Sequence, residues 1–174
     1  PVVKALWYLQ FGAKVLLYLA VDKISRRMFN ILFYRNYKGW QIEIVQERAG
    51  RCFDTITKPR IFPEALKCIE EHQASGDTLV LATGTLDLIA QPLADLLGID
   101  HVISVSLEET GGSYTGRLTG QPISEGQKAQ AVEKFAHEHD IDLSASYGYG
   151  DSIADLAMLE CVGHRVAVAP EKGL

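Results

Sequence analysis

The sequence predicts an α/β fold in which a parallel sheet is flanked by helices and preceded by a small all-helical domain. The first observation is that short apolar runs alternate with helical patterns after residue 59, as in proteins with a parallel sheet. The second is that residues 1–58 show helical periodicity and few turn signals. With 174 residues, of which 47% are hydrophobic, the chain is long enough to form both parts. We therefore predict two domains, at residues 1–58 and 59–174.

The helical domain begins with an apolar segment, residues 2–21, which is about as long as a membrane-spanning helix. Lys4 and Lys14 lie inside it, and a lysine at the centre of a span costs about 2.5–3.5 kcal/mol. A spanning helix is therefore disfavoured. We favour a helix packed on other helices, and a helix lying on a membrane surface is the alternative. Gly39 and Gly50 are natural helix ends, so we expect three or four helices in this domain.

The elements of the second domain follow from local signals. Pro63 suits the first turn of a helix, where no backbone N–H is needed, and Gly76 ends that helix. Residues 78–83 are a short apolar run between Gly76 and Gly84, which predicts a buried parallel strand. The pair of glycines at 111–112 predicts a hairpin over residues 111–120. The other expected elements are helices at 85–98, 125–139 and 152–161, and strands at 101–109, 144–150 and 164–169.

Charge and cysteine content exclude several classes of protein. The net charge is −5, and no run of residues resembles the dense basic face that nucleic-acid binding requires. Cys52, Cys68 and Cys161 are odd in number and form no C-x-x-C motif, which argues against a disulfide framework or a zinc site. They are typical of thiols in a reducing compartment, so we expect a cytoplasmic protein.

Hydroxyl groups and a glycine follow the first predicted strand. Thr83, Gly84 and Thr85 come where this strand is expected to end and the next helix to begin. Ligands of open α/β sheets bind beyond the carboxyl ends of the strands. Hydroxyls and free N–H groups at a helix N-terminus bind phosphate readily. We therefore predict that Thr83 and Gly84 bind phosphate, with simple helix capping as the alternative.

Two carboxylates follow a later predicted strand. Asp151 comes directly after Gly150, and Asp155 lies one helical turn further on. Carboxylates at a strand end suit Mg²⁺, which takes oxygen ligands and keeps several of its waters. The alternative is that Asp151 only caps the helix that begins at Ser152. A magnesium site formed by Asp151 and Asp155 is the functional interpretation.

A lysine lies between these two sites in the sequence. Lys128 is near the start of the helix expected at 125–139, where the helix dipole disfavours a positive charge. Lys134 lies on the solvated side of the same helix and is interpreted as a surface residue. A lysine at a position that the helix dipole disfavours is expected to bind an anion. The hydroxyl, the lysine and the carboxylate pair are together the parts of a phosphate-and-magnesium site.

Three segments resemble motifs of one enzyme superfamily. "LVLATGT" (79–85), "GQK" (126–128) and "YGYGDSIADLAML" (147–159) resemble motifs II, III and IV of the haloacid dehalogenase (HAD) superfamily, in its phosphoserine-phosphatase-like subgroup. Residues 59–170 resemble the subgroup closely, and residues 1–58 resemble its helical cap loosely. The resemblance implies a Rossmann-like parallel sheet flanked by helices, with a small all-helical cap that selects the substrate.

The resemblance also implies a mechanism and a role for each matched residue. An aspartate would attack a small phosphomonoester, and water would hydrolyse the aspartyl-phosphate. Thr83 would bind the phosphoryl oxygens, and Lys128 would neutralise the phosphate and the nucleophile. Asp151 would ligate Mg²⁺, and Asp155 would support the metal-binding face or reach the metal through water. Three arginines of the cap, Arg26, Arg27 and Arg35, are candidates for a second anionic group of the substrate, although a solvated surface role is favoured for each.

The family's motif I, a D-x-D sequence that carries the nucleophile, is absent from the 174 residues. Asp140 and Asp142 form the one D-x-D present, but it follows the polar "FAHEHD" and comes after Lys128, so we interpret it as a turn. Motif I lies on the central strand in this family, and its loss would leave unpaired strands and a gap in the core. We therefore expect that the chain is a fragment and is inactive alone. The alternative is a catalytically inactive phosphate- or metal-binding module, associated with a membrane surface through residues 2–21.

Overall fold

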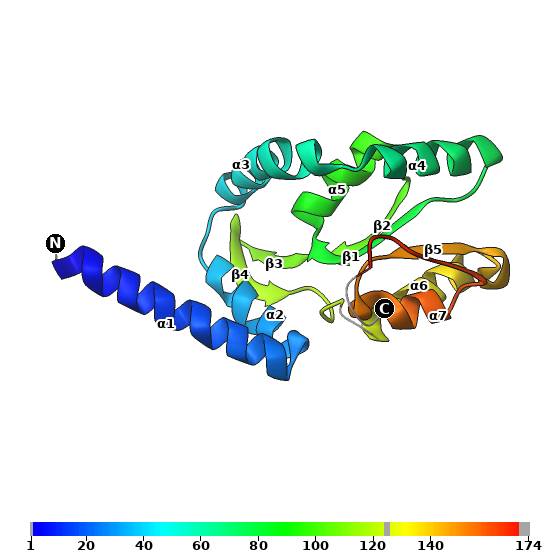
Figure 1. The fold of residues 1–174 in the computed structure, drawn as a ribbon. Coiled ribbons are helices and arrows are strands. Elements are labelled where there is room, and N and C mark those ends of the chain that lie inside the picture. The colour runs from blue at the N-terminus through cyan, green and yellow to red at the C-terminus, as the bar shows by residue number, and fades with distance from the viewer. Residues whose placement is uncertain (1, 124–125, 171–174) are drawn as a thin grey trace.

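Figure 1 presents the fold as a computed structural model, which describes residues 2–123 and 126–170. The N-terminal part is helical, with α1 (Val2–Ile24), α2 (Arg26–Tyr34), η1 (Arg35–Tyr37), α3 (Ile42–Cys52), η2 (Phe53–Thr57) and η3 (Lys58–Arg60). The middle part contains α4 (Pro63–Ser75), β1 (Val80–Leu86), α5 (Asp87–Leu97), β2 (His101–Val105), β3 (Leu107–Thr110) and β4 (Ser113–Leu118). The last part contains α6 (Gly126–Glu138), η4 (Leu143–Ala145), β5 (Tyr147–Gly150), η5 (Ile153–Asp155), α7 (Leu156–Glu160) and β6 (His164–Ala167).

Parallel strands and the helices between them form the α/β part. β1 pairs with β2, with Val80 opposite His101, and β5 pairs with β6, with Tyr147 opposite His164. Helix α5 makes the crossover that parallel pairing of β1 and β2 requires, and α7 makes the crossover between β5 and β6. The predicted α/β class, with parallel strands flanked by helices, is confirmed.

The two parallel pairs do not join into one sheet in the part of the chain that the structure describes. A cavity of about 550 Å³ lies between them. Val80 and Ala82 of β1 line one side, and Tyr147 and Tyr149 of β5 line another. β1 and β5 therefore each have one strand neighbour and face a space on the other side.

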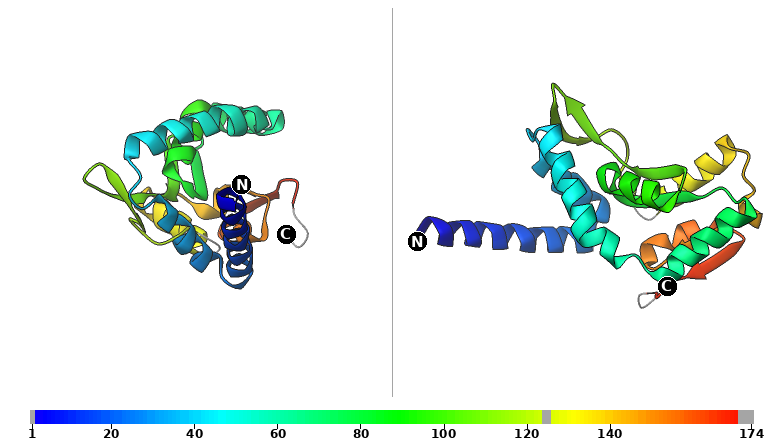
Figure 2. Two further views of the ribbon diagram at one scale, coloured as in Figure 1. Left: turned by 90° about the vertical axis from the view of Figure 1, so that its left-hand side faces the viewer. Right: turned by 90° about the horizontal axis from the view of Figure 1, so that it is seen from above.

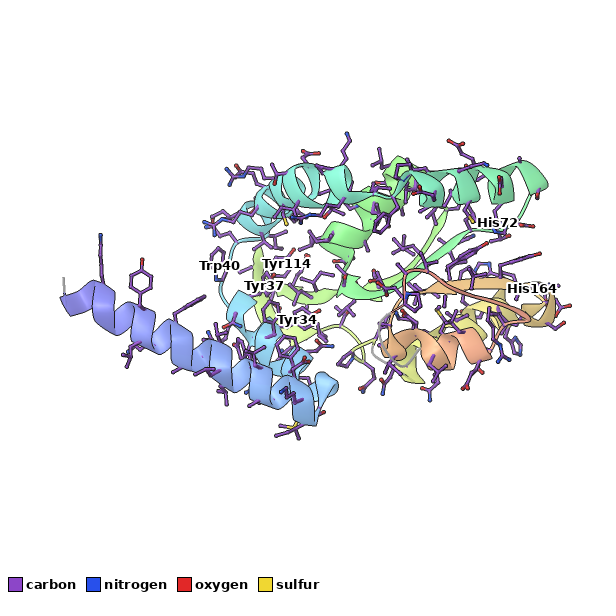
Figure 3. The ribbon with its side chains drawn as sticks, in the orientation of Figure 1. Tyr34, Tyr37, Trp40, His72, Tyr114 and His164 are labelled. Carbon is purple, nitrogen blue, oxygen red and sulfur yellow. The ribbon has the colours of Figure 1, made fainter. Side chains whose placement is uncertain are left out.

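Aromatic side chains connect the N-terminal helices to one another. Ser25 caps α2, its Oγ accepting from the backbone N–H of Met28 at 3.2 Å. The turn at Ser25 brings the end of α1 against α2, where Tyr18 meets the edge of Phe29 with ring centroids 5.9 Å apart. Further ring contacts continue along α2 and into the hairpin of β3 and β4, through Phe33, Tyr34, Tyr37 and Tyr114. Among the side chains labelled in Figure 3, Tyr34, Tyr37 and Tyr114 lie together where α2 meets β4.

The hairpin of β3 and β4 is hydrogen-bonded to the helical N-terminal part. The N–H of Gly39 donates to the carbonyl of Tyr114 at 2.8 Å, and the N–H of Tyr114 donates to the carbonyl of Trp40 at 2.9 Å. The N–H of Ile42 donates to the carbonyl of Gly112 at 3.2 Å. Residues from both sides of the predicted boundary also share a hydrophobic cluster, formed by Tyr34, Val45, Leu86, Val105, Leu107 and Tyr114.

Several predicted boundaries differ from the structure, and three of the differences have a clear physical reason. β1 continues to Leu86, because its backbone resumes pairing opposite Val105 after an irregularity, so α5 begins at Asp87 and not at residue 85. The strand predicted at 101–109 breaks at Ser106, where the chain leaves β2 for the hairpin. Residues 144–146 are not a strand, because Asp142 caps a helical turn there by accepting from the N–H of Ser144 at 2.8 Å.

Asp140 and Asp142 lie in the turn between α6 and β5, as predicted for this D-x-D sequence. Asp140 has a φ of 53°, a conformation that aspartate tolerates in turns. The three cysteines are half-buried and free. Among the described residues, no helix combines the length and the apolar character that crossing a bilayer demands.

Candidate active site

Lys128 and Asp155 form a buried ion pair at the centre of the candidate site. Lys128 is the third residue of α6, and its Nζ lies 2.5 Å from Oδ1 of Asp155. The two side chains are only 13% and 9% exposed. Burial acts to raise the pKa of Asp155, but the hydrogen bond and charge of Lys128, with backbone N–H groups of Ser152 and Asp151, hold that pKa below its usual range. The carboxylate is therefore ionised at neutral pH and fixes the lysine amine in place.

The second oxygen of Asp155 holds the loop that follows β5. Oδ2 accepts from the backbone N–H groups of Asp151 and Ser152 and from the hydroxyl of Ser152, each at 3.2 Å. A Cβ on Gly150 would lie 2.7 Å from the Cβ of Asp155, so the loop can approach this closely only because residue 150 is glycine. Both oxygens of Asp155 are thus engaged by the protein itself.

Asp151 lies on the outer side of this loop. Asp151 is exposed, and its carboxylate forms no hydrogen bond or ion pair with the side chains that the structure describes. Ser152, and not Asp151, is the N-cap of the short helical turn η5, with Asp155 at the N3 position of a capping box. The interpretation of Asp151 as a helix cap is therefore wrong. Its carboxylate is available to a ligand at the carboxyl end of β5.

Thr83 and Gly84 lie near the carboxyl end of β1. The Oγ of Thr83 accepts from the N–H of Thr85 at 3.1 Å, which turns the strand locally. A Cβ at Gly84 would lie 2.5 Å from the carbonyl oxygen of Ile123, so only glycine fits there. Because Ile123 is five residues before Lys128, this contact brings the start of α6 beside the end of β1. Helix α6 packs on both β1 and η5, so it links Thr83 to the Asp155 turn.

The helical part of the chain touches this site through Tyr34, a residue that the sequence motifs did not single out. The hydroxyl of Tyr34 donates to the carbonyl of Gly84 at 3.3 Å. The tyrosine is only 6% exposed, and burial raises the pKa of its hydroxyl, so it remains a neutral donor. Its position in an apolar helical pattern predicts a core residue and gave no signal of the contact with Gly84.

A pocket of about 380 Å³ lies beside the end of β1. Its walls come from α2 and η1, from α3, from the end of β1 and from the start of α5, and are mostly apolar. Arg48 lies at the rim with its guanidinium 4.7 Å from the centroid of the Trp40 ring. The other lining residues are Phe33, Asn36, Tyr37, Val45, Ala49, Cys52, Leu86, Leu88 and Ile89. Leu86 is three residues after Thr83, a length of chain that spans at most about 11 Å. The wall of the pocket at Leu86 is therefore within about 11 Å of Thr83.

Other residues singled out in the sequence lie at the surface or outside the described part of the structure. Arg35 is exposed in η1, and the side chains of Arg26 and Arg27 lie outside the described residues. Lys134 forms an exposed i,i+4 pair with Glu138 at 3.7 Å, as expected of a surface lysine. In the described residues, no group of three His, Cys, Asp or Glu side chains could by itself hold a metal ion.

A second polar network lies between α4 and β5, where the sequence gave no expectation. Nδ1 of His72 is 2.7 Å from the carboxylate of Asp77, and its Nε2 is 2.7 Å from the hydroxyl of Tyr149. Burial, with a hydrogen bond and charge from Cys68, raises the pKa of Tyr149 to about 12. The His72 ring also faces Tyr147, which stacks on His164 with ring centroids 4.4 Å apart. These contacts join α4 to β5 along the wall of the large cavity.

Comparison with known proteins assigns the family. The family model described as haloacid dehalogenase-like hydrolase matches residues 4–160. The chain belongs to the haloacid dehalogenase-like hydrolases. The resemblance predicted from the three motifs is therefore confirmed, and Thr83, Lys128, Asp151 and Asp155 all lie inside the matched region.

The curated relatives of this chain include proteins with phosphatase names. A probable phosphatase of Mycobacterium tuberculosis is 35% identical over 136 residues, covering 78% of this chain and 47% of that protein. An inhibition of morphological differentiation protein of Streptomyces azureus is 32% identical over 138 residues, with 79% and 50% covered. A phosphoserine phosphatase of M. tuberculosis is 30% identical over 122 residues, with 70% and 40% covered. The chain thus spans about half the length of the curated relatives it matches.

Solved structures share the haloacid dehalogenase fold of this chain. A Bordetella pertussis protein of unknown function superposes with a TM-score of 0.82 at 22% identity, covering 94% of this chain and 75% of that one. A probable phosphoserine phosphatase from Vibrio cholerae gives a TM-score of 0.75 at 22% identity, covering 92% and 47%. At this level of identity the match supports the fold alone.

Proposed function

We propose that the protein is a Mg²⁺-dependent phosphomonoester hydrolase that acts on a small phosphorylated metabolite through an aspartyl-phosphate intermediate. The observation that carries this proposal is the buried pair of Lys128 and Asp155, beside the exposed carboxylate of Asp151. A lysine fixed by a carboxylate can neutralise a phosphate without moving. Phosphoryl transfer depends chiefly on such positioning and on neutralising the negative charge of the transferred group.

Each residue has a separate task in this proposal. The hydroxyl of Thr83 and the backbone at Gly84 bind the phosphoryl oxygens. The ammonium of Lys128 lies between the phosphate and the attacking carboxylate and offsets their repulsion. Asp155 is a positioning residue, because its two oxygens are bonded to Lys128 and to the loop of residues 151–152.

The donor set fits a magnesium ion. Mg²⁺ is commonly held by one or two carboxylates, with phosphate oxygens and waters completing the octahedron. Asp151 supplies one exposed carboxylate at a strand end, which matches the first part of such a set. When bound, the ion would neutralise phosphate charge. Asp155 would support the position of Asp151, in keeping with its hydrogen bond from the Asp151 N–H.

The nucleophile is proposed to come from a strand outside the 174 residues. The cavity of about 550 Å³ between β1 and β5 supports this, because both strands face it with edges that a further strand could pair. Such a strand would end beside Thr83 and Asp151, where an aspartate could attack the phosphate. The 174 residues alone would then bind phosphate without hydrolysing its esters.

The pocket of about 380 Å³ is proposed to receive the leaving group. Its lining of Phe33, Val45, Leu88 and Ile89 favours an apolar or aromatic group over a charged amino acid. Arg48 at the rim provides one positive charge, stacked on Trp40. The helical part would act as the cap of the site, with Tyr34 joining it to Gly84.

The test is a comparison of phosphatase activity in the full-length protein and three variants, with several phosphomonoesters and with Mg²⁺ or EDTA. We expect activity that needs Mg²⁺ and that falls at least about a hundredfold in Asp151→Asn and Lys128→Ala. Lys134→Ala is the matched control, because this lysine lies on the same helix at the surface, and it should keep full activity. Full activity in both site variants would reject the proposal.

A non-catalytic phosphate-binding module is the second candidate. It is favoured by one observation, that Asp140 and Asp142, the only D-x-D of the chain, lie in a turn and not after an apolar strand. In that case calorimetry with inorganic phosphate would detect binding that Lys128→Ala abolishes, while the full-length protein would turn over no phosphomonoester.

A further inference from the structure

Positive charge is concentrated at the start of a chain that is acidic as a whole. Residues 1–42 contain seven basic residues and one acidic residue, Asp22, so their formal charge is +6. The net charge of the chain is −5, so residues 43–174 carry the balance of −11. Such asymmetry between two parts of a chain is typical of proteins that contact nucleic acid or a membrane. The basic residues are Lys4, Lys14, Lys23, Arg26, Arg27, Arg35 and Lys38.

Several basic side chains of this part form no ion pair among the residues that the structure describes. Lys4, Lys23, Arg35 and Lys38 are exposed and take part in none of the described ion pairs. Lys14 donates to the amide oxygen of Asn36 at 2.5 Å, which is a neutral partner. The field of this segment therefore remains positive and attracts anions over about a Debye length, 8 Å at physiological salt.

The same segment exposes a broad apolar surface. Leu9 is 76% exposed, Leu16 is 69%, Leu19 is 57% and Leu17 is 56%. At about 100° per residue, Leu9, Leu16 and Leu19 lie within an arc of about 80° on the side of α1 that faces away from Tyr18 and α2, and Leu17 lies beside this arc. Figures 1 and 2 show that the N-terminal half of α1 projects from the rest of the molecule. A contiguous apolar surface of this kind marks an interaction site.

The combination of charge and leucines selects the partner. Nucleic acid would match the charge but would leave the leucines in contact with a highly charged backbone. A second copy would match the leucines but would bring two segments of +6 together, which like-charge repulsion opposes. An anionic phospholipid surface matches both, because acyl chains receive the leucines and head groups receive the lysines and arginines.

We propose that α1 and α2 dock the protein on an anionic membrane surface. The helix lies along the interface and does not cross it, since the lysines stay at the level of the head groups with their stems along the apolar boundary. The candidate active site is far along the chain from the docking leucines, so docking and phosphate chemistry use separate residues. The proposal therefore stands independently of the proposed phosphatase activity.

The test is co-sedimentation of the full-length protein with vesicles of phosphatidylcholine, with and without phosphatidylglycerol. Leu9→Glu with Leu16→Glu removes the apolar surface at exposed positions, and Phe62→Glu is the matched control because Phe62 is 64% exposed elsewhere. Lys4→Gln with Lys23→Gln removes charge, and Lys134→Gln is its control. Circular dichroism and melting temperature establish that each variant is folded.

We expect binding to the anionic vesicles alone, weakened by salt. The double glutamate variant should bind at least about tenfold more weakly, and each lysine removed should cost about fivefold, while both controls bind like the parent. Absence of binding to anionic vesicles, or unchanged binding by the double glutamate variant, overturns the proposal. Sedimentation equilibrium tests the alternative of a second copy. The proposal is also overturned if the parent is a dimer that binds no vesicles and the double glutamate variant is a monomer.

Discussion

The amine of Lys128 lies 2.5 Å from the carboxylate of Asp155, and the two residues come from elements that are 27 positions apart in the sequence. The pair therefore ties α6 to the turn after β5 as well as fixing a positive charge at the site. The other carboxylate oxygen of Asp155 accepts hydrogen bonds from the loop that presents Asp151. A single buried ion pair thus connects the stability of the fold with the geometry of the site.

Replacing Lys128 with methionine should lower the stability of the protein by about 3–5 kcal/mol, because Asp155 would remain buried without its partner. Lys134→Met breaks only an exposed pair and should cost about 0.5 kcal/mol or less. Urea unfolding of the two variants and the parent measures both values. Equal stability of the two variants would contradict the assignment of a buried, stabilising pair.

The pair should also make stability depend on pH. The pKa of Asp155 is lowered in the folded protein, so its ionisation contributes stability above the pKa of an unfolded aspartate, and this contribution is lost as the pH falls through the folded value. The Asp155→Asn variant has no carboxylate at this position and therefore lacks this pH-dependent contribution to stability. The difference in unfolding free energy between parent and Asp155→Asn should therefore be largest near neutral pH and shrink in acid. A difference that stays constant down to about pH 3, below the ordinary pKa of aspartate, would rule out this explanation.

Gly84→Ala should destabilise the protein by about 1–3 kcal/mol, because the new Cβ would meet the rigid backbone oxygen of Ile123. Gly50→Ala is the matched control. Gly50 lies in α3 with no heavy atom within 4 Å of an added Cβ, so alanine there should add about 0.5–1 kcal/mol of stability. Thermal unfolding compares the two changes, and a neutral Gly84→Ala would show that the Ile123 segment can move away.

Ala49→Trp should fill the pocket of about 380 Å³ and change which esters the full-length protein accepts. If the pocket receives the leaving group, KM for an aryl phosphate such as 4-nitrophenyl phosphate should rise about tenfold or more, while kcat changes less. Hydrolysis of a compact ester such as phosphoserine should be affected less. Steady-state kinetics on both substrates provides the measurement, and equal effects on the two esters would place the leaving group elsewhere.

Much of the fold could be predicted because its signals are local. Pro63 and Gly76 mark the two ends of α4, and Gly98 ends α5, as the turn chemistry of these residues predicts. The position of Lys128 in the first turn of α6 follows from the same kind of signal. The matched motifs gave the family, because their residue types and order lie within short stretches of sequence.

The remaining features depend on contacts between distant residues. The end of β1 was misplaced because Gly84 and Thr85 suggest a break, whereas pairing of Leu86 opposite Val105 extends the strand. The bond from Tyr34 to Gly84 joins residues 50 positions apart, and no local pattern distinguishes it from core packing. Asp155 was assigned to the metal because its type suits Mg²⁺, and its engagement by Lys128 required the three-dimensional arrangement.

The backbone bonds between the hairpin and the residues around Trp40 restrict how the molecule can move. The N–H groups of Gly39, Ile42 and Tyr114 hold these two segments together, so the helical part cannot swing open and leave β3 and β4 behind. The helical part and the hairpin therefore form one unit, which the two strands of chain that leave the hairpin and the segment after η3 connect to the rest of the molecule. Those strands meet at Ser106 and Thr119, whose backbones are joined by one hydrogen bond of 3.0 Å. The two ends of the hairpin are therefore fixed beside each other at the point where they join the α/β part.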